Sequence, residues 1–120
     1  MSGAPREVLA RYVALAMKIA IRTGNDALAT VIAEAIVNGE IEAQYEALGE
    51  LMSAKISDEL YTYLAVLLAA TNRPPLLAML EQQLHGGRKP RAIEDALRVR
   101  TTPEQEAILK RWEDGDELPA

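Results

Sequence analysis

The chain lacks several residue types on which common protein chemistry depends. It contains no cysteine, no phenylalanine, one tryptophan and one histidine among 120 residues. Without cysteine there is no disulfide framework, no thiolate nucleophile and no cysteine-bound zinc, which is compatible with a reducing cytosol. With one histidine, the paired Glu-x-x-His motifs of a di-iron site cannot be assembled. We therefore expect a cytoplasmic protein with no metal and no cofactor.

Long apolar runs and a basic overall charge are also missing. The most apolar run, residues 60–70, is too short to span a bilayer and contains Thr62 and two tyrosines. The apolar N-terminal stretch is interrupted by Arg11, Lys18 and Arg22, unlike that of a signal peptide. A formal net charge of −5 works against attraction of the whole chain to a phosphate backbone. The sequence predicts a soluble protein that has no membrane partner.

What remains is rich in Ala, Leu and Glu, which are strong helix formers. Apolar residues recur at three-four spacing between turn signals. This pattern predicts helices over about residues 5–23, 25–38 and 41–54, followed by helices beginning near residues 57, 74, 90 and 102. We predict an all-α fold, a compact bundle of six to seven short helices. It would form a single domain over residues 1–113, followed by a flexible acidic tail at 114–120.

Local signals refine these helices. Asn25, Ser57 and Thr102 precede helical stretches and are typical N-cap residues. Thr102 and Gln105 also have the spacing of a capping box, in which each side chain bonds the backbone of the other. Residues 60–70 carry no charge on any face. A helix that is apolar all round is usually buried all round, so this segment is predicted to be the central helix.

An internal similarity relates two parts of the chain. Residues 26–36 align with residues 58–68 at an offset of 32, and the apolar positions of 45–52 continue onto 77–84 at the same offset. One interpretation is a pair of stacked helical hairpins, 26–54 and 58–86, as in a short α-solenoid. The other is that amphipathic helices of equal length align by chance. Residues 64–84 resemble a tetratricopeptide-type hairpin but lack most of that family's aromatic and glycine pattern, so the resemblance implies nothing about function.

His85 is the one side chain that invites a catalytic interpretation. It lies four residues after Glu81 at the end of a predicted helix. A histidine near a helix C-terminus is favoured because its charged form complements the last carbonyls, and this interpretation outweighs catalysis. Ser57 is accounted for as a cap. Gly86 and Gly87 follow a helix rather than a strand, so they do not form a phosphate-binding loop.

Two charged surfaces are the candidate sites. The first is a basic patch, near the start of a predicted helix where backbone N–H groups also favour anions; its members are His85, Arg88, Lys89, Arg91, Arg98 and Arg100. The second is an acidic face formed by Glu42, Glu46 and Glu50 at steps of four, which should face water or a basic partner. For the basic patch, the competing interpretation is a solvated turn whose arginines pair with nearby carboxylates. That interpretation is favoured, because the chain is acidic and no aromatic residues interleave.

We predict that the protein is a small helical protein–protein interaction or assembly module, an adaptor, accessory subunit or inhibitor without catalysis of its own. Its partner would be another protein or a second copy, since a stack of helical hairpins presents broad surfaces. One alternative is a nucleic-acid-associated subunit that uses the patch at residues 85–100. A second is an enzyme with a site made of carboxylates and His85.

Overall fold

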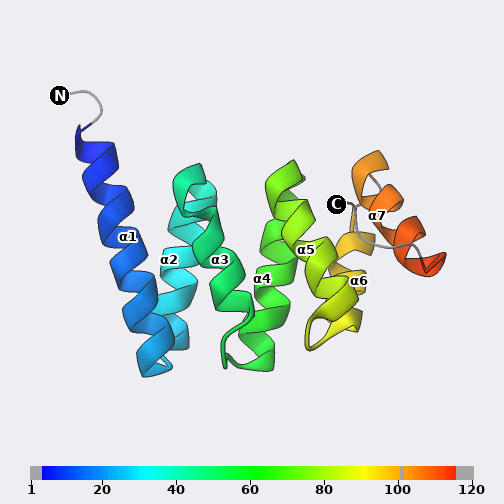
Figure 1. Ribbon diagram of the computed structural model, residues 1–120, viewed down its shortest axis with the longest axis horizontal. Helices are drawn as coiled ribbons and strands as arrows, with labels where there is room; N and C mark the ends of the chain where they lie inside the picture. The colour runs from blue at the N-terminus through cyan, green and yellow to red at the C-terminus, as the bar shows by residue number, and fades with distance from the viewer. Residues whose placement is uncertain (1–3, 101, 116–120) are drawn as a thin grey trace. The chain divides into compact units, whose positions relative to one another are not determined.

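The computed structural model describes residues 4–100 and 102–115, and side chains from residue 11 onward. Within these ranges the chain is entirely helical, as predicted, and contains no strand. No described helix is long and apolar enough to cross a bilayer. The elements are α1 (Ala4–Thr23), α2 (Asp26–Asn38), the 3₁₀-helix η1 (Glu42–Gln44), α3 (Tyr45–Met52), α4 (Asp58–Thr71), α5 (Pro74–Gly86), α6 (Pro90–Arg98) and α7 (Pro103–Glu113) (Figure 1).

Backbone proximity divides the chain into two units, residues 1–60 and residues 61–120, with the boundary near the start of α4. In unit 1, α1 packs on α2, η1 and α3, and α2 packs on α3. In unit 2, α5 packs on both α6 and α7, and α6 packs on α7. A single domain over residues 1–113 stays a prediction. Most of the predicted tail, residues 116–120, lies outside the described residues.

The helices begin where the sequence predicts caps. The side chains of Asn25, Ser57 and Thr102 each accept a hydrogen bond from the backbone N–H three residues on, at 3.0, 3.1 and 3.2 Å. Such a cap stabilises a helix by about 1 kcal/mol, because it satisfies a donor that has no partner inside the helix. The second hydrogen bond predicted for this capping box, from the backbone N–H of Thr102 to the side chain of Gln105, is wrong. The side chain of Gln105 turns inward and donates to the carbonyl of Ala69 instead.

Helix starts recur along the chain at a constant interval. The first helices of three hairpins begin at Asp26, Asp58 and Pro90, which are equally spaced at the offset that aligns positions 26–36 with 58–68. Glu40 and Asn72 are related by the same offset, and both have a left-handed backbone, with φ of 53° and 52°. The chain therefore holds three helical hairpins of similar layout, α2 with η1–α3, α4 with α5, and α6 with α7. The third was not found from the sequence.

Each unit has its own set of buried apolar side chains. In unit 1 they come from α1, α2 and α3, and the largest are Met17, Ile36, Leu48, Leu51 and Met52. In unit 2 they come from α4, α5 and α6, and the largest are Tyr61, Leu64, Leu68, Leu76, Leu80, Leu84 and Ile93. Full burial of a Leu, Ile or Met side chain contributes about 1.5–3 kcal/mol, so these side chains dominate the stability of the fold.

Three predicted features of the helices differ from the structure. The three-four spacing of apolar residues places Tyr12 and Ile19 on one apolar face of α1, but both are exposed, and Met17 is buried. The segment predicted to be one helix from residue 41 to 54 begins as η1, and α3 ends at Met52. The expectation that the uncharged segment 60–70 is buried on every side is wrong, because Tyr63 and Val66 are exposed. Their exposure opens a surface on α4.

Candidate functional site

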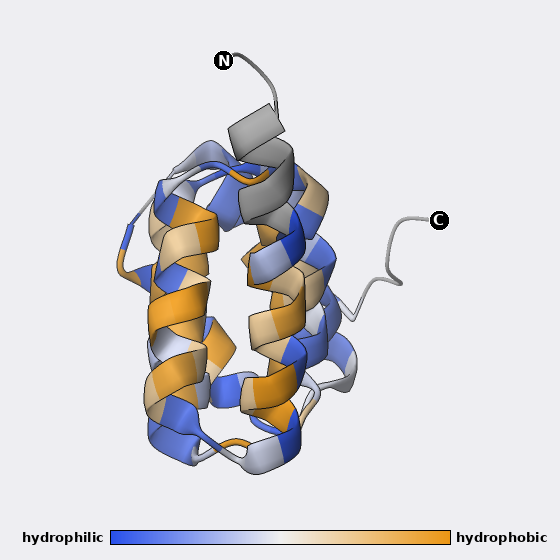
Figure 2. Ribbon diagram, turned by 90° about the vertical axis from the view of Figure 1, so that its left-hand side faces the viewer, coloured by the Kyte–Doolittle hydropathy of each residue, from blue (hydrophilic) through white to orange (hydrophobic). Residues whose placement is uncertain are grey.

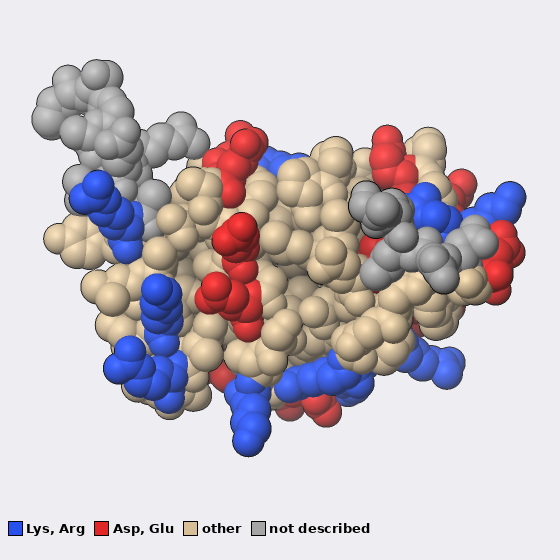
Figure 3. All heavy atoms as spheres, viewed as in Figure 1, with Lys and Arg blue, Asp and Glu red and all other residues tan. Residues whose placement is uncertain are grey.

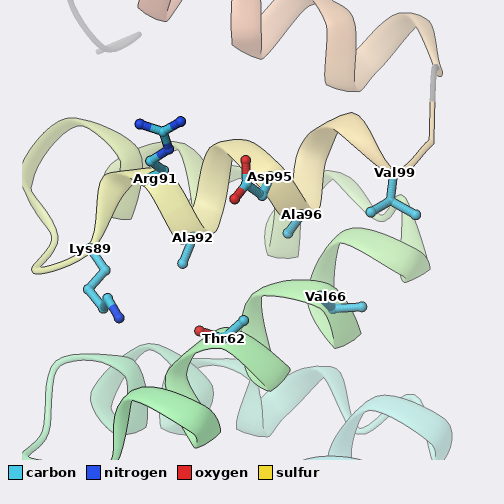
Figure 4. Close-up of a pocket in the computed structure, with 8 residues that line it drawn as sticks. All are labelled: Thr62, Val66, Lys89, Arg91, Ala92, Asp95, Ala96 and Val99. Carbon is cyan, nitrogen blue, oxygen red and sulfur yellow. The ribbon is translucent and has the colours of Figure 1, made fainter.

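A groove lies between α4 and α6 in unit 2, with a volume of about 420 Å³. Thr62 and Val66 of α4 form one wall, and Ala92 and Ala96 of α6 form the other (Figure 4). Ala92 is partly exposed, whereas Ala96 is buried, with 2% of its surface exposed. Val99, just after α6, completes the lining at one end. The groove therefore combines apolar side chains with polar and charged ones, and it is flanked by helices on both sides.

Its apolar walls are open to solvent. Val66 is 42% exposed and Val99 is 72% exposed. Lys89 borders the other end, while Arg91 and Asp95 point to the side of α6 away from α4 (Figure 4). A groove with small and β-branched apolar walls and a cation at one end suits an apolar segment with a nearby carboxylate. Its lining residues include no pair of groups placed for proton transfer or nucleophilic attack.

Most of the basic patch predicted from the sequence is engaged in contacts within the fold. Arg98 pairs with Glu94 at 2.7 Å and with Glu113 at 2.6 Å. The hydrogen bond to Glu94, followed by that to Glu113, raises the pKa of Arg98 above its ordinary value. Arg100 donates to the carbonyl of Ala70 at 2.6 Å. These contacts agree with the sequence interpretation in which the arginines pair within the protein.

The remaining patch members fall in three different settings. Arg88 lies over the ring of Tyr61, with its guanidinium carbon 5.1 Å from the ring centre, a distance at which a cation and an aromatic face attract. Lys89 and Arg91 are near the groove. His85 lies in the last turn of α5, as predicted, and its Nε2 atom is buried without a hydrogen-bond partner among the described residues. The six residues thus differ in how the fold holds them, and their role as a patch for a partner stays a prediction.

The acidic face is exposed as predicted. Glu42 of η1 and Glu46 and Glu50 of α3 are all exposed to solvent. Figure 3 shows acidic side chains in a line over η1 and α3, and basic side chains over the neighbouring α1. Both rows belong to unit 1. Three carboxylates that repel one another weakly are stable at a surface because water screens them.

A buried polar network joins the end of α4 to the start of α7. Gln105, fully buried, donates from Nε2 to the carbonyl of Ala69 at 2.8 Å and to Asn72 Oδ1 at 3.0 Å. Thr102 donates to the same oxygen of Asn72, and Asn72 donates to Glu104 at 3.2 Å. A hydrogen bond from its own backbone N–H, followed by that from Asn72, lowers the pKa of Glu104. Most of these groups bond to one another and join α4 to α7, while Gln105 Oε1 is buried without a hydrogen-bond partner among the described residues.

Glu81 is the buried acidic residue of unit 2, and Arg111 of α7 binds it with two nitrogens. The Nε and Nη2 atoms of Arg111 each lie 2.8 Å from a different oxygen of the Glu81 carboxylate. A bidentate pair of this kind fixes both orientation and charge. It joins α5 to α7 and leaves neither group available for acid–base chemistry.

In the described part of the chain, no group of three or more His, Cys, Asp or Glu side chains could hold a metal ion. Comparison with protein-family models, curated proteins and solved structures finds no match to this chain. The site must therefore be interpreted from its own residues.

Sequence reasoning identified Lys89 and Arg91 but missed the groove that they border. Helix spacing places Tyr63, Val66 and Ala70 on one face of the uncharged helix, and the absence of charge in residues 60–70 predicts that this face is buried. Val99 carried a usable signal, because it is an apolar residue between two arginines, Arg98 and Arg100, directly after a helix. Such a residue is usually solvent-exposed and therefore available to a partner.

Proposed function

We propose that this protein is a small helical interaction module that binds a segment of another protein in the groove between α4 and α6. The observation that carries this proposal is the open apolar lining of the groove, in which Val66 and Val99 are exposed to solvent on different elements. Large exposed apolar groups that converge on one hollow mark interaction sites in otherwise water-soluble proteins.

The groove favours an amphipathic helix as its occupant. Two helices form its walls, and a third helix packs between two others by placing its apolar face over the gap. The small side chain of Ala92, which is partly exposed, allows close approach. The nine residues of α6 extend over about 13 Å, which matches two to three turns of a bound helix. A carboxylate on that helix would lie near Lys89, which borders the end of the groove opposite Val99.

A peptide-display library of amphipathic helices, panned on the intact protein, tests this proposal. Selected peptides should share apolar positions at three-four spacing and an acidic residue. Substitution of Val99 by Glu should weaken their binding at least about tenfold, or about 1.4 kcal/mol, because a charge would then enter the apolar wall. Val31→Glu is the matched control, since Val31 is an exposed valine of unit 1. Equal binding of the selected peptides to the wild type and to Val99→Glu would refute the groove as the site.

Binding to nucleic acid is the competing outcome. Duplex DNA and RNA at low salt should show no binding, because Arg98 and Arg100 are engaged within the fold. Binding that weakens steeply with salt and disappears in the Lys89→Glu, Arg91→Glu double variant would favour the nucleic-acid alternative instead.

A further inference from the structure

Unit 1 carries a second exposed apolar surface, on the first helix. Tyr12, Leu15 and Ile19 of α1 are 66%, 56% and 44% exposed, and Val31 of α2 is 62% exposed. The α1 residues are spaced by three and four, so they form one stripe along the helix. α1 packs on α2, and Figure 2 shows the two helices side by side with apolar residues on both. An apolar stripe of this length is typical of an interface.

The repeat offset relates residues of α1 to residues that are buried in α3. Val13 of α1 and Tyr45 of α3 are related by the repeat offset, and both are buried. At the same offset, exposed Ile19 corresponds to Leu51, which is fully buried in α3. α3 has α1 beside it, whereas no described helix covers the outer side of α1. The outer face of α1 is therefore an uncovered position of the repeat, suited to another helix.

The charged residues of α1 and α2 indicate which partner can cover the outer face of α1. α1 contains four basic residues and one acidic residue, and Arg11, Lys18 and Arg22 are exposed beside the apolar stripe. α2 contains two acidic residues and no basic residue; Asp26 accepts a hydrogen bond from the backbone N–H of Ser57, and Glu34 is partly exposed. The two helices of this face thus carry opposite net charge. A second copy of the same chain supplies a matching surface if its α2 meets α1.

We propose that two copies of this chain associate through the α1–α2 face of unit 1, with α1 of each copy packed against α2 of the other. A two-fold axis parallel to the helices produces this arrangement and makes each helix meet its charge complement. A two-fold axis perpendicular to the helices would instead place α1 of one copy antiparallel to α1 of the other. The three exposed cations of each α1 would then face those of its copy. Four helices packed in this way would form a four-helix bundle at the interface.

The positions of the apolar residues fit the crossed arrangement. α1 and α2 are joined by a turn at Gly24 and Asn25. At 1.5 Å per residue, Ile19, Val31 and Leu15 lie about 7, 9 and 13 Å from that turn. A two-fold axis along the helices preserves these heights, so Val31 of one copy would lie between Ile19 and Leu15 of the other. This is the knob-into-hole geometry that helices use when they pack.

The character of the last helix favours a closed dimer over an open chain of copies. The exposed positions of α7 include Glu104, Glu106, Lys110 and Glu113, so this helix is polar on its outer side. Terminal elements of repeat proteins are normally polar in this way. An apolar face cannot pair with that surface, and so it pairs with its own copy. Two helices about 20 Å long and 10 Å wide give a footprint of about 400 Å² per copy, below the size of stable specific interfaces, which predicts a weak dimer that dissociates on dilution.

Light scattering after size-exclusion chromatography, from about 5 to 500 μM protein, tests the proposal on the full chain. The wild type should be a dimer at high concentration and dissociate on dilution. The Leu15→Ser, Ile19→Ser double variant should be monomeric at all these concentrations. Both side chains are exposed, so the fold should persist, and far-UV circular dichroism verifies this. Val99→Ser is the matched control, since Val99 is exposed in unit 2, and it should dimerise like the wild type.

A charge exchange tests the crossed arrangement. Arg11→Glu with Lys18→Glu should be monomeric, and Glu34→Lys alone should dimerise at least about tenfold more weakly. A mixture of the two variants should form a heterodimer, because the carboxylates introduced at positions 11 and 18 then meet the lysine introduced at position 34, while the unchanged α1 meets an unchanged α2. A wild type that stays monomeric at the highest concentration would overturn the proposal. So would a dimer that the Leu15 and Ile19 substitutions leave intact. The groove between α4 and α6 is untouched by these variants, so the two proposals fail independently.

Discussion

The ion pair between Glu81 and Arg111 gives a prediction in which a second substitution restores stability lost by the first. Replacement of Arg111 by Met removes both hydrogen bonds to a carboxylate whose side chain is only 6% exposed. Breaking a fully buried pair from one side costs about 3–5 kcal/mol, because a charge remains buried without a partner. The Arg111 side chain is 35% exposed, so water can partly replace it. We expect a loss of about 2–3 kcal/mol in the free energy of unfolding.

Replacing both partners should cost less than replacing one. In the Glu81→Leu, Arg111→Met double variant no charge is left buried, and two apolar side chains of similar size pack between α5 and α7. Such replacements are close to neutral in other proteins, so the double variant should lie within about 1 kcal/mol of the wild type. The addition of Glu81→Leu to Arg111→Met should therefore raise stability by about 1–2 kcal/mol.

Urea unfolding followed by far-UV circular dichroism measures these differences. Arg98→Met is the matched control, because Arg98 also binds carboxylates but its side chain is 48% exposed. It should leave the unfolding midpoint unchanged. A double variant no more stable than Arg111→Met would refute the reasoning, because the cost would then come from lost packing rather than from an unpaired buried charge.

Three further predictions concern the backbone and pH. Gly87→Ala should destabilise by about 1–3 kcal/mol, because its Cβ would lie 2.5 Å from the carbonyl oxygen of Gln83. A Cβ added at Gly86 would meet open space, so Gly86→Ala should be neutral or stabilising. Thermal unfolding of the two variants measures this difference. Glu40→Gly should stabilise by about 0.5–1 kcal/mol in urea unfolding, because Glu40 has a left-handed backbone with φ of 53°. Burial raises the pKa of Tyr61, against a hydrogen bond from Lys89 and the charge of Arg88. The stability from Tyr61 is fully present below its unfolded pKa of 10.0 and is lost as pH rises through the higher folded pKa. Wild type should therefore lose stability relative to Tyr61→Phe above about pH 10 in a series of urea titrations.

Local signals allowed the helices to be predicted, because caps and turns act over three or four residues. Asn25, Ser57 and Thr102 cap helices as expected. Which side of each helix is buried was harder to predict. In α1, apolar residues lie on almost every side, so periodicity alone cannot choose between Met17 and Ile19 as the buried one. Packing against α2 and α3 makes that choice.

The contacts made by the basic patch differ in how far they could be predicted from the sequence. Arg98, one turn after Glu94 on α6, pairs with it by helix geometry, which is a local effect visible in the sequence. The contacts of Arg100 with the end of α4 and of Arg88 with Tyr61 join parts of the chain that are far apart in sequence. Such long-range contacts depend on how the hairpins pack and leave no pattern in the chain. The acidic face was predictable because its exposure follows from one short stretch alone.

The short length of α6 explains both the groove and the contact that Arg100 makes with α4. α4 is 14 residues long, whereas α6, which starts at the same point of the repeat, has nine. Because α6 ends at Arg98, Val99 is left beside the end of the helix instead of inside it. The last carbonyls of α4 need donors. They receive them from the chain after α6, where Arg100 of the connection binds Ala70 and Gln105 of α7 binds Ala69. One shortened helix therefore both engages an exposed arginine in the fold and leaves Val99 exposed beside the groove.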